Sequence, residues 1–301
     1  MKLSLGSILP GPDRGWKAMY PVCGLASCSN KSTMRNVRNR TGITVERVWY
    51  CGVDCFAVAA SNRFRTLLNA NVVEMPHVPR RSIGLVMLSK GTITSEQLQL
   101  AYEQSHMRGE ELEAVLMRLG FASERQLAAA RAAQWGCPVL GQDGIGQAVE
   151  ADIPPTLLEA YFAVPIHSSV AAKRMVLGFV YRVEHSLLNS LEQITGLRAD
   201  PCFITPAERV EQLRRLTHDS NCEEIVFDDP YTPAAMANNV AGFALEVSAG
   251  EARFAYCRNF VWARLTGKRQ RLDVLFRTGK AKQLGMQEDL RLPQQRLRAI
   301  G

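Results

Sequence analysis

The sequence lacks several features that would define its function at once. It has no apolar run of the roughly 20 residues that a membrane-spanning helix needs, so we expect no transmembrane segment. The phosphate-binding pattern Gly-x4-Gly-Lys-Ser/Thr is absent, because Gly267-Lys268 lacks both the upstream glycine and the following hydroxyl residue. The first residues lack the apolar core and the cleavage site of a secretory signal. We therefore expect a cytoplasmic protein without the ATP-binding loop of a P-loop ATPase.

Groups of catalytic side chains are missing as well. The five histidines are spread along 301 residues without a conspicuous partner. The adjacent carboxylates Glu110-Glu111 and Asp228-Asp229 point apart on any regular element. Because no nucleophile, base and orienting group can be assigned by role, we predict that the protein is not an enzyme.

The net charge of +7 permits an acidic partner such as nucleic acid, a nucleotide or an anionic membrane. The basic residues are scattered, with modest clusters at 35–40, at 268–271 and near the C-terminal end. Clusters of this size are usually solvated surfaces. A nucleic-acid-binding zinc protein, using the N-terminal region and its basic 35–40 segment, is therefore an alternative hypothesis and not the main one.

Four of the eight cysteines occur within the first 55 residues, as two close pairs. Cys23 and Cys28 are separated by four residues, and Cys51 and Cys55 by three. Two such pairs are typical of a tetrahedral zinc site, and in a reducing compartment they favour a metal over disulfides. Four thiolates would close the coordination sphere, which predicts structural zinc. The alternative is four small buried side chains without a metal.

The residues around the second pair support the metal hypothesis. Residues 45–50 alternate like a strand that leads to Cys51 and a tight turn at 52–54. Cys55 then begins a helix with apolar residues at helical spacing. A last ligand in the first turn of a helix is typical of treble-clef fingers. A module of about 50 residues has little core of its own, so a metal would contribute much of its folding free energy. The cysteines without a close pair are interpreted as core residues or as chance occurrences: Cys137, Cys202, Cys222 and Cys257.

The middle of the chain contains one pattern twice, at 83–102 and 112–131, with Gly91 and Gly120 at equivalent positions. Each copy predicts a short helix, a glycine that ends it, and a longer helix. Thr94 and Ser123 are predicted N-caps, each followed three residues later by a glutamine that completes a capping box. A repeated unit of this size cannot bury its apolar face alone, so we expect the copies to form a four-helix module.

The remaining sequence predicts two mixed units behind a proline-containing linker at 69–79. The first has helices at 155–162, 186–195 and 206–216, and strands at 164–166, 174–181 and 201–204. The second has a helix at 233–243 and strands at 224–227, 245–247, 252–257 with 260–265, and 272–276.

We therefore predict an α+β multidomain protein. Its predicted parts are a zinc-finger-like module (1–72), a helical-hairpin repeat (80–138), a compact α+β domain (139–218), a small C-terminal α+β unit (219–279) and a basic tail (280–301).

Both copies of the repeat follow in outline the motif Leu-Gly-x2-Leu-Val-x2-Gly-x6-Leu-x3-Leu-x2-Gln. The pattern resembles the MshEN type of N-terminal domain of bacterial secretion and pilus assembly ATPases, the GspE N-terminal family. Residues 153–216 resemble the α/β half of that domain, and Trp49-Tyr50-Cys51 with Cys55 resembles small treble-clef fingers. The resemblance implies an interaction or regulatory protein whose partner is a component of the type II secretion or type IV pilus machinery.

Some members of this family bind cyclic di-GMP along the two motifs, so a second-messenger receptor is the alternative function. The resemblance would place Arg81, Ile83, Gly84, Met87, Leu88 and Gly91 in one half-site, and Leu112, Leu116, Met117, Gly120 and Gln134 in the other. Ser82, Ser105 and Glu113 depart from the motif. At Glu113 a carboxylate replaces glycine, which adds bulk and repels a phosphate.

Overall fold

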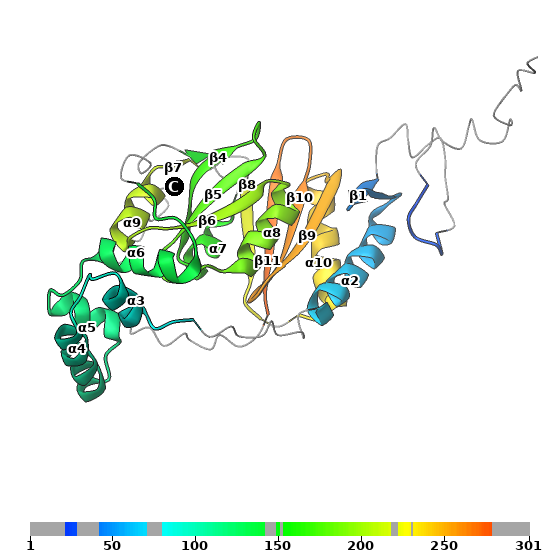
Figure 1. The fold of residues 1–301 in the computed structure, drawn as a ribbon. Coiled ribbons are helices and arrows are strands. Elements are labelled where there is room, and N and C mark those ends of the chain that lie inside the picture. Colours follow the sequence, from blue (N-terminus) through cyan, green and yellow to red (C-terminus); the bar gives the residue numbers. More distant parts are fainter. Residues whose placement is uncertain are drawn as a thin grey trace, which may run out of the picture.

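The structure is a computed structural model that describes residues 22–28, 42–70, 80–141, 149–150, 153–217, 222–229 and 231–278. In these ranges the strands form a six-stranded sheet in the order β2-β1-β9-β10-β11-β8, a three-stranded sheet β4-β5-β6 and the pair β3-β7. The helices of the repeat lie at one end of the molecule, beside the three-stranded sheet (Figure 1). None of the helices in the described part is long and apolar enough to cross a membrane. The predicted linker (in part) and basic tail lie outside the described residues.

The repeat has the predicted helices. They are α3 (Ile83–Ser89), α4 (Ser95–Arg108), α5 (Leu112–Arg118) and α6 (Glu124–Trp135). Gly91 and Gly120 have φ angles of 66° and 70°, in the left-handed region where glycine is unstrained. Thr94 and Ser123 accept hydrogen bonds from the N3 backbone N–H groups, and both capping boxes are complete. The sequence prediction of two equivalent helical hairpins is confirmed.

Equivalent residues of the two copies build one core. Val86, Met87 and Leu98 are buried together with their counterparts 29 residues later, Val115, Leu116 and Leu127. Helix α3 packs on α6, and α4 packs on α5. Each short helix therefore packs on the longer helix of the other copy, which gives the predicted four-helix module.

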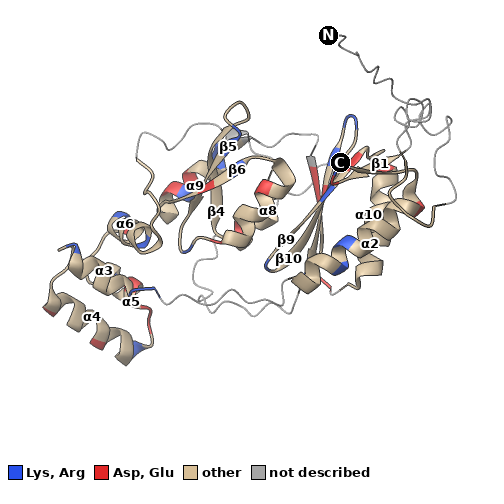
Figure 2. Cartoon of the chain, turned by 45° about the vertical axis from the view of Figure 1, so that its right-hand side comes forward, with Lys and Arg blue, Asp and Glu red and all other residues tan. Residues whose placement is uncertain are grey.

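The symmetry ends at the outer faces of the two long helices. On α6, Ala128, Ala132 and Trp135 are buried or partly buried, and α6 packs on β6. The equivalent residues of α4 are Gln99, Glu103 and His106, which are exposed. Figure 2 shows acidic residues along α4. The outer face of α4 thus carries polar side chains that contact water. The equivalent face of α6 carries small and aromatic side chains that pack on the next domain.

That next domain is the predicted compact α+β unit. Its strands are β4 (Ala163–Ser169), β5 (Arg174–Phe179) and β6 (Arg198–Phe203), its helices α7 (Pro155–Ala160), α8 (His185–Thr195) and α9 (Pro206–Arg214), and β3 (Val149–Glu150) pairs with β7 (Leu216–Thr217). Strand β4 is antiparallel to β5, and β5 is parallel to β6 through the crossover helix α8. Four apolar residues of α8 are buried at the predicted helical spacing.

The C-terminal part consists of β8 (Cys222–Phe227), α10 (Pro233–Glu246), β9 (Glu251–Cys257), β10 (Phe260–Thr266) and β11 (Arg271–Arg277). The predicted strand at 245–247 is wrong, because Leu245 and Glu246 end α10 and Val247 is its C-cap. The three-residue segment Leu-Glu-Val is too short to show a period, and of its residues only Val247 is buried.

The N-terminal part contains β1 (Ile43–Val45), β2 (Val48–Tyr50) and α2 (Val53–Ala70). The single strand predicted at 45–50 is instead a hairpin, in which Val45 pairs with Val48. The turn residues Glu46 and Arg47 have φ angles of 47° and 72°. Two-residue hairpin turns of this kind usually contain glycine or asparagine. The residue types at 46 and 47 therefore do not indicate that the chain turns back at this point.

The structure also corrects the predicted separation of the 1–72 and 219–279 units. Strand β1 pairs in parallel with β9, and α2 packs on α10 against the same face of the sheet. Phe64 of α2 makes edge contacts with Phe254 and Phe276, at ring-centroid distances of 5.0 and 5.9 Å. Residues 42–70 and 222–278 therefore form one discontinuous domain, with residues 71–221 inserted between its halves in the sequence. Neither half has a complete core alone.

The opposite face of the six-stranded sheet packs on α8, where Trp262 and Leu275 share a core with the α+β domain. A charged row crosses this face in register: Arg253, Arg264, Asp273 and Glu224. Arg253, at the positive end of the row, donates to the Ile194 carbonyl in the last turn of α8 at 2.9 Å. Glu224, at the negative end, accepts from Thr156 at the start of α7. Both ends complement a helix dipole.

Candidate functional site

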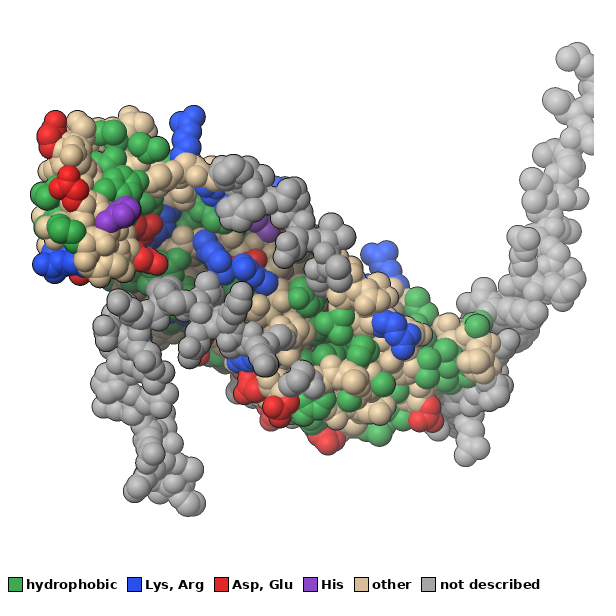
Figure 3. Space-filling model, turned by 90° about the horizontal axis from the view of Figure 1, so that it is seen from below, with side chains coloured by type: hydrophobic (Ala, Val, Ile, Leu, Met, Phe, Trp, Pro, Cys, Tyr) green, Lys and Arg blue, Asp and Glu red, His purple; other side chains and the backbone are tan. Residues whose placement is uncertain are grey.

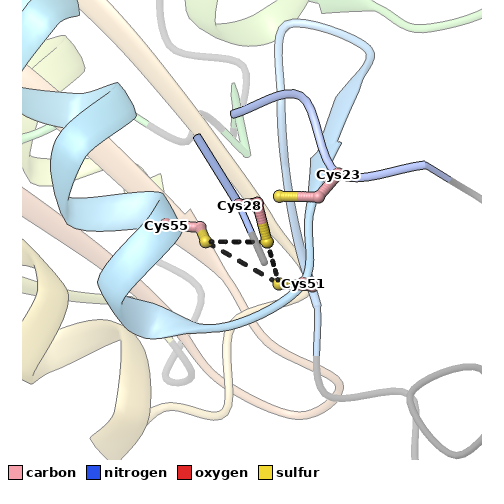
Figure 4. A group of neighbouring side chains, drawn as sticks. All are labelled: Cys23, Cys28, Cys51 and Cys55. Atoms are coloured by element: carbon pink, nitrogen blue, oxygen red, sulfur yellow. Dashed lines mark hydrogen bonds between the residues drawn. The ribbon is translucent and has the colours of Figure 1, made fainter. Parts of the chain in front are cut away.

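The four cysteines of the N-terminal region converge in space. The Sγ atoms of Cys28, Cys51 and Cys55 lie 3.5, 3.6 and 3.7 Å from one another, and Cys23 completes a group in which all sulfurs are within 4.8 Å (Figure 4). Tetrahedral zinc with bonds of about 2.3 Å holds its sulfur ligands about 3.8 Å apart. A disulfide would bring two sulfurs to about 2.05 Å. The cluster therefore has the dimensions of a four-thiolate metal site.

Local backbone structure positions each ligand. The Cys28 N–H donates to the Leu25 carbonyl at 3.0 Å, which folds residues 23–28 into a tight turn, and the Gly24 N–H donates to the Trp49 carbonyl of β2 at 2.8 Å. A Cβ atom on Gly24 would lie 2.2 Å from Val48 Cγ1, so only glycine allows this approach. Cys51 directly follows β2, and Cys55 lies in the first turn of α2. A turn, a hairpin and a helix start thus deliver the four sulfurs.

Burial raises the pKa of two thiols of the cluster, whereas hydrogen bonds lower the pKa of a third. Burial raises the pKa of Cys51 to about 11 and moves the pKa of Cys55 in the same direction. For Cys23, burial also acts to raise the pKa, but hydrogen bonds from the backbone N–H groups of Cys51 and Leu25 outweigh it and lower the pKa. The pKa of Cys23 is thus lowered, whereas the pKa values of Cys51 and Cys55 are raised. A metal would displace the protons of Cys51 and Cys55.

The other cysteines have different surroundings. Cys202 and Cys257 are buried in the apolar core, and burial raises the pKa of each to about 12. Cys137 is half-buried, and its Sγ lies 3.6 Å from the Trp135 carbonyl. The side chain of Cys222 lies outside the described part. These positions agree with the interpretation of Cys137, Cys202 and Cys257 as residues outside the metal cluster.

The residues of the two motifs divide into core and surface groups. Ile83, Met87 and Leu116 are buried in the module core. A Cβ atom on Gly84 would lie 2.6 Å from Leu98 Cδ1, so this glycine permits close helix packing. Core packing accounts for all four without a ligand. The residues at least partly accessible to a ligand are Arg81, Leu88, Gly91, Leu112, Met117, Gly120 and Gln134.

Glu113, which replaces a motif glycine, forms an ion pair with Arg131 of α6. Arg131 is buried, donates to the Val180 carbonyl at 3.0 Å and lies over the Tyr181 ring. The negative charge at Glu113 is thus neutralised within the protein. Sequence reasoning missed Arg131, although an arginine among the alanines of the buried α6 face was a signal that a partner must exist.

The two serine departures also have local partners. Ser82 Oγ lies 2.9 Å from the Tyr102 hydroxyl, and Ser105 donates to the Glu110 carbonyl at 2.6 Å. The Gln134 side chain donates to the backbone carbonyl of Arg81. Of these contacts, that of Ser82 lies within the first copy, that of Ser105 reaches the segment between the copies, and that of Gln134 joins the second copy to the first.

Comparison with known structures finds chains that are weakly similar to part of this one. A structure of MshE with cdg is 20% identical, with 45% of this chain and 99% of that chain covered, at a TM-score of 0.37. The N-terminal domain of XpsE is 21% identical, with 46% and 99% covered, at a TM-score of 0.34. No family model matches the sequence.

A particular relative is the type IV pilus assembly ATPase PilB of Thermus thermophilus, which is 28% identical over 123 residues. The match covers 40% of this chain and 14% of PilB. This chain thus spans only a small part of the length of that curated relative.

Proposed function

We propose that this chain is a non-enzymatic interaction or regulatory protein, related to the N-terminal domain of secretion and pilus assembly ATPases and acting in the cytoplasm. Its N-terminal region is a treble-clef-like finger that holds one structural zinc ion. The convergence of Cys23, Cys28, Cys51 and Cys55 carries the proposal. Four soft sulfur ligands suit zinc and leave no open position for a reacting water, which favours a structural role over a catalytic one.

Metal analysis of the purified full chain tests the zinc site. We expect about one zinc per chain, as in a structural four-thiolate site, and little zinc in the Cys28→Ser and Cys55→Ser variants. Cys137→Ser is the matched control, because Cys137 lies outside the cluster, and it should retain the metal. Wild-type protein prepared without chelators that holds less than about half an equivalent would end the zinc proposal.

The interaction role is supported by the pilus ATPase relative and by the absence of a phosphate-binding loop from the sequence. We expect the partner to be a protein component of secretion or pilus machinery. Cross-linking in native cells should join the chain to such a component. The non-enzymatic part is tested with pure protein, which should not hydrolyse ATP or GTP. Steady hydrolysis that follows the protein through purification would overturn it.

Cyclic di-GMP binding is the second candidate, favoured by the contact of α3 with α5, which brings the two motifs together. Glu113 acts against it, because its side chain adds bulk where the motif has glycine, and its ion pair with Arg131 occupies a cation that a phosphate could otherwise use. We expect no heat with wild-type protein at high micromolar ligand in calorimetry, and compare it with Glu113→Gly. Saturable heat with the wild type would make the receptor the better proposal. Salt-dependent binding of DNA or RNA would favour the nucleic-acid alternative.

A further inference from the structure

The cysteine cluster lies at one end of the six-stranded sheet and shares a domain with the C-terminal residues. We infer that metal occupancy of the cluster and folding of residues 222–278 are thermodynamically linked, so that the metal controls the C-terminal sheet. This rests on the proposed zinc site and goes further, because an autonomous finger would release its metal without affecting the sheet.

The metal ligands are adjacent in sequence to residues of the shared core. Cys55 is followed by Phe56, which is fully buried and stacks on Phe254 of β9 at 6.3 Å between ring centroids. Cys51 is preceded by Tyr50, which packs against the same core. A metal that fixes the two sulfurs would therefore also fix the start of α2 and the end of β2 against the sheet.

The hairpin between the two cysteine pairs cannot be stable by itself. Strands β1 and β2 have three residues each, and isolated hairpins are marginal even when longer. Strand β1 gains its remaining partners from β9, where the Thr44 N–H donates to the Gly250 carbonyl at 2.9 Å. Its Ile43 and Val45 side chains are buried in the core that contains α10. The order of β1 thus depends on both the cluster and the C-terminal sheet.

Helix α2 extends the link across the sheet. Phe64 lies nine residues beyond Cys55, about 13 Å along the helix axis, and contacts both Phe254 and Phe276. Seen from below, the molecule shows hydrophobic side chains interspersed with charged ones, and several acidic side chains lie along one edge (Figure 3). If the metal stabilises α2 on the sheet, then contacts of α2 with the sheet must strengthen metal binding by the same factor, because linkage is reciprocal.

The helical repeat provides a built-in contrast. Among the described residues, its core contains none from the cysteine cluster or the six-stranded sheet. Leu116 of this core is as fully buried as Phe64. Substitutions at these two positions therefore differ in location and not in burial, and only Phe64 belongs to the domain that contains the cysteines.

Competition with a chromophoric chelator measures the zinc affinity of the full-length chain. We expect Phe64→Ala to weaken zinc binding at least tenfold and Leu116→Ala to change it less than twofold. The tenfold change expected for Phe64→Ala falls within the range of ordinary coupling between two sites, about 5- to 150-fold. Phe64→Leu replaces Phe64→Ala if the latter does not fold. Equal affinities of wild type and the Phe64 variant, or an equal loss in Leu116→Ala, would overturn the linkage.

Hydrogen exchange of the wild type, with zinc and after chelation, gives a readout without any substitution. Amides of β9 and β10 should exchange at least tenfold faster after chelation, while those of α3–α6 should not change. Protection of β9 and β10 that does not depend on zinc would overturn the inference and leave an autonomous zinc finger. A wild type that binds no zinc would instead refute the proposed metal site, and the linkage with it.

Discussion

Replacing Asp273 by asparagine removes the charge at the centre of the charged row and keeps the shape of the side chain. Asp273 is 1% exposed and Arg264 is 6% exposed as side chains. The carboxylate accepts from Arg264 Nε and Nη2 and from Trp262 Nε1, each at 2.8 Å. Without the carboxylate, a buried guanidinium loses the group that compensates its charge.

The structure allows the size of this effect to be estimated. Removing one partner of a buried ion pair costs about 3–5 kcal/mol, whereas replacing both by apolar residues of similar volume is often neutral or stabilising. We expect Asp273→Asn to lose about 3 kcal/mol of unfolding free energy. The double variant Arg264→Met/Asp273→Leu should be more stable than Asp273→Asn, because no buried charge is left unpaired, and its remaining loss should be about 1–3 kcal/mol because the Trp262 Nε1–H group lacks its acceptor.

Urea unfolding followed by tryptophan fluorescence is the assay, because Trp262 contacts the pair. Asp200→Asn is the matched control. Asp200 pairs with Arg174, whose side chain is 62% exposed, and exposed pairs contribute at most about 1 kcal/mol. A loss below about 1 kcal/mol in Asp273→Asn, or a double variant as unstable as the single one, would refute the reasoning that this pair is held by burial.

Other perturbations have equally specific outcomes. Ser123→Ala removes a capping hydrogen bond and should cost about 1 kcal/mol in thermal or urea unfolding; an unchanged midpoint would contradict the cap. Gly84→Ala inserts a methyl group into close helix packing and should cost about 1–3 kcal/mol; unchanged stability would contradict the need for glycine beside Leu98. Glu113→Gln leaves Arg131 without its counter-charge and should lower the melting temperature; an unchanged melting temperature would contradict a stabilising pair. Metal-free protein should lose stability as the pH rises from 9 to about 11, because burial raises the pKa of Cys51 from 9.0 to about 11 and folding thus favours the protonated thiol. Zinc-loaded protein should not show that loss.

Local features of the fold could be predicted from the sequence because they depend on neighbouring residues. The αL glycines Gly91 and Gly120 and the caps at Thr94 and Ser123 define where the helices of the repeat begin and end. The periodicity of α8 identified its buried face. The spacing of the cysteine pairs identified the group of four that the structure brings together.

Predictions failed where the local signal was short or unusual. The Glu46-Arg47 turn has left-handed backbone without glycine or asparagine, so a hairpin was taken for one strand. The end of α10 was taken for a strand because residues 245–247 are too few to show a period. In both cases the tertiary contacts of the segment outweigh its weak intrinsic preference.

Sequence alone determined the repeat, its caps and the composition of the cysteine cluster, since each follows from the spacing of residue types along the chain. Only the tertiary structure decided that β1 pairs with β9, that Glu113 meets Arg131, and that Arg253, Arg264, Asp273 and Glu224 form one row. These contacts join segments far apart in the chain. Strand pairing and charge pairing depend on which surfaces remain to be buried once the local elements have formed, and a single sequence does not record that choice.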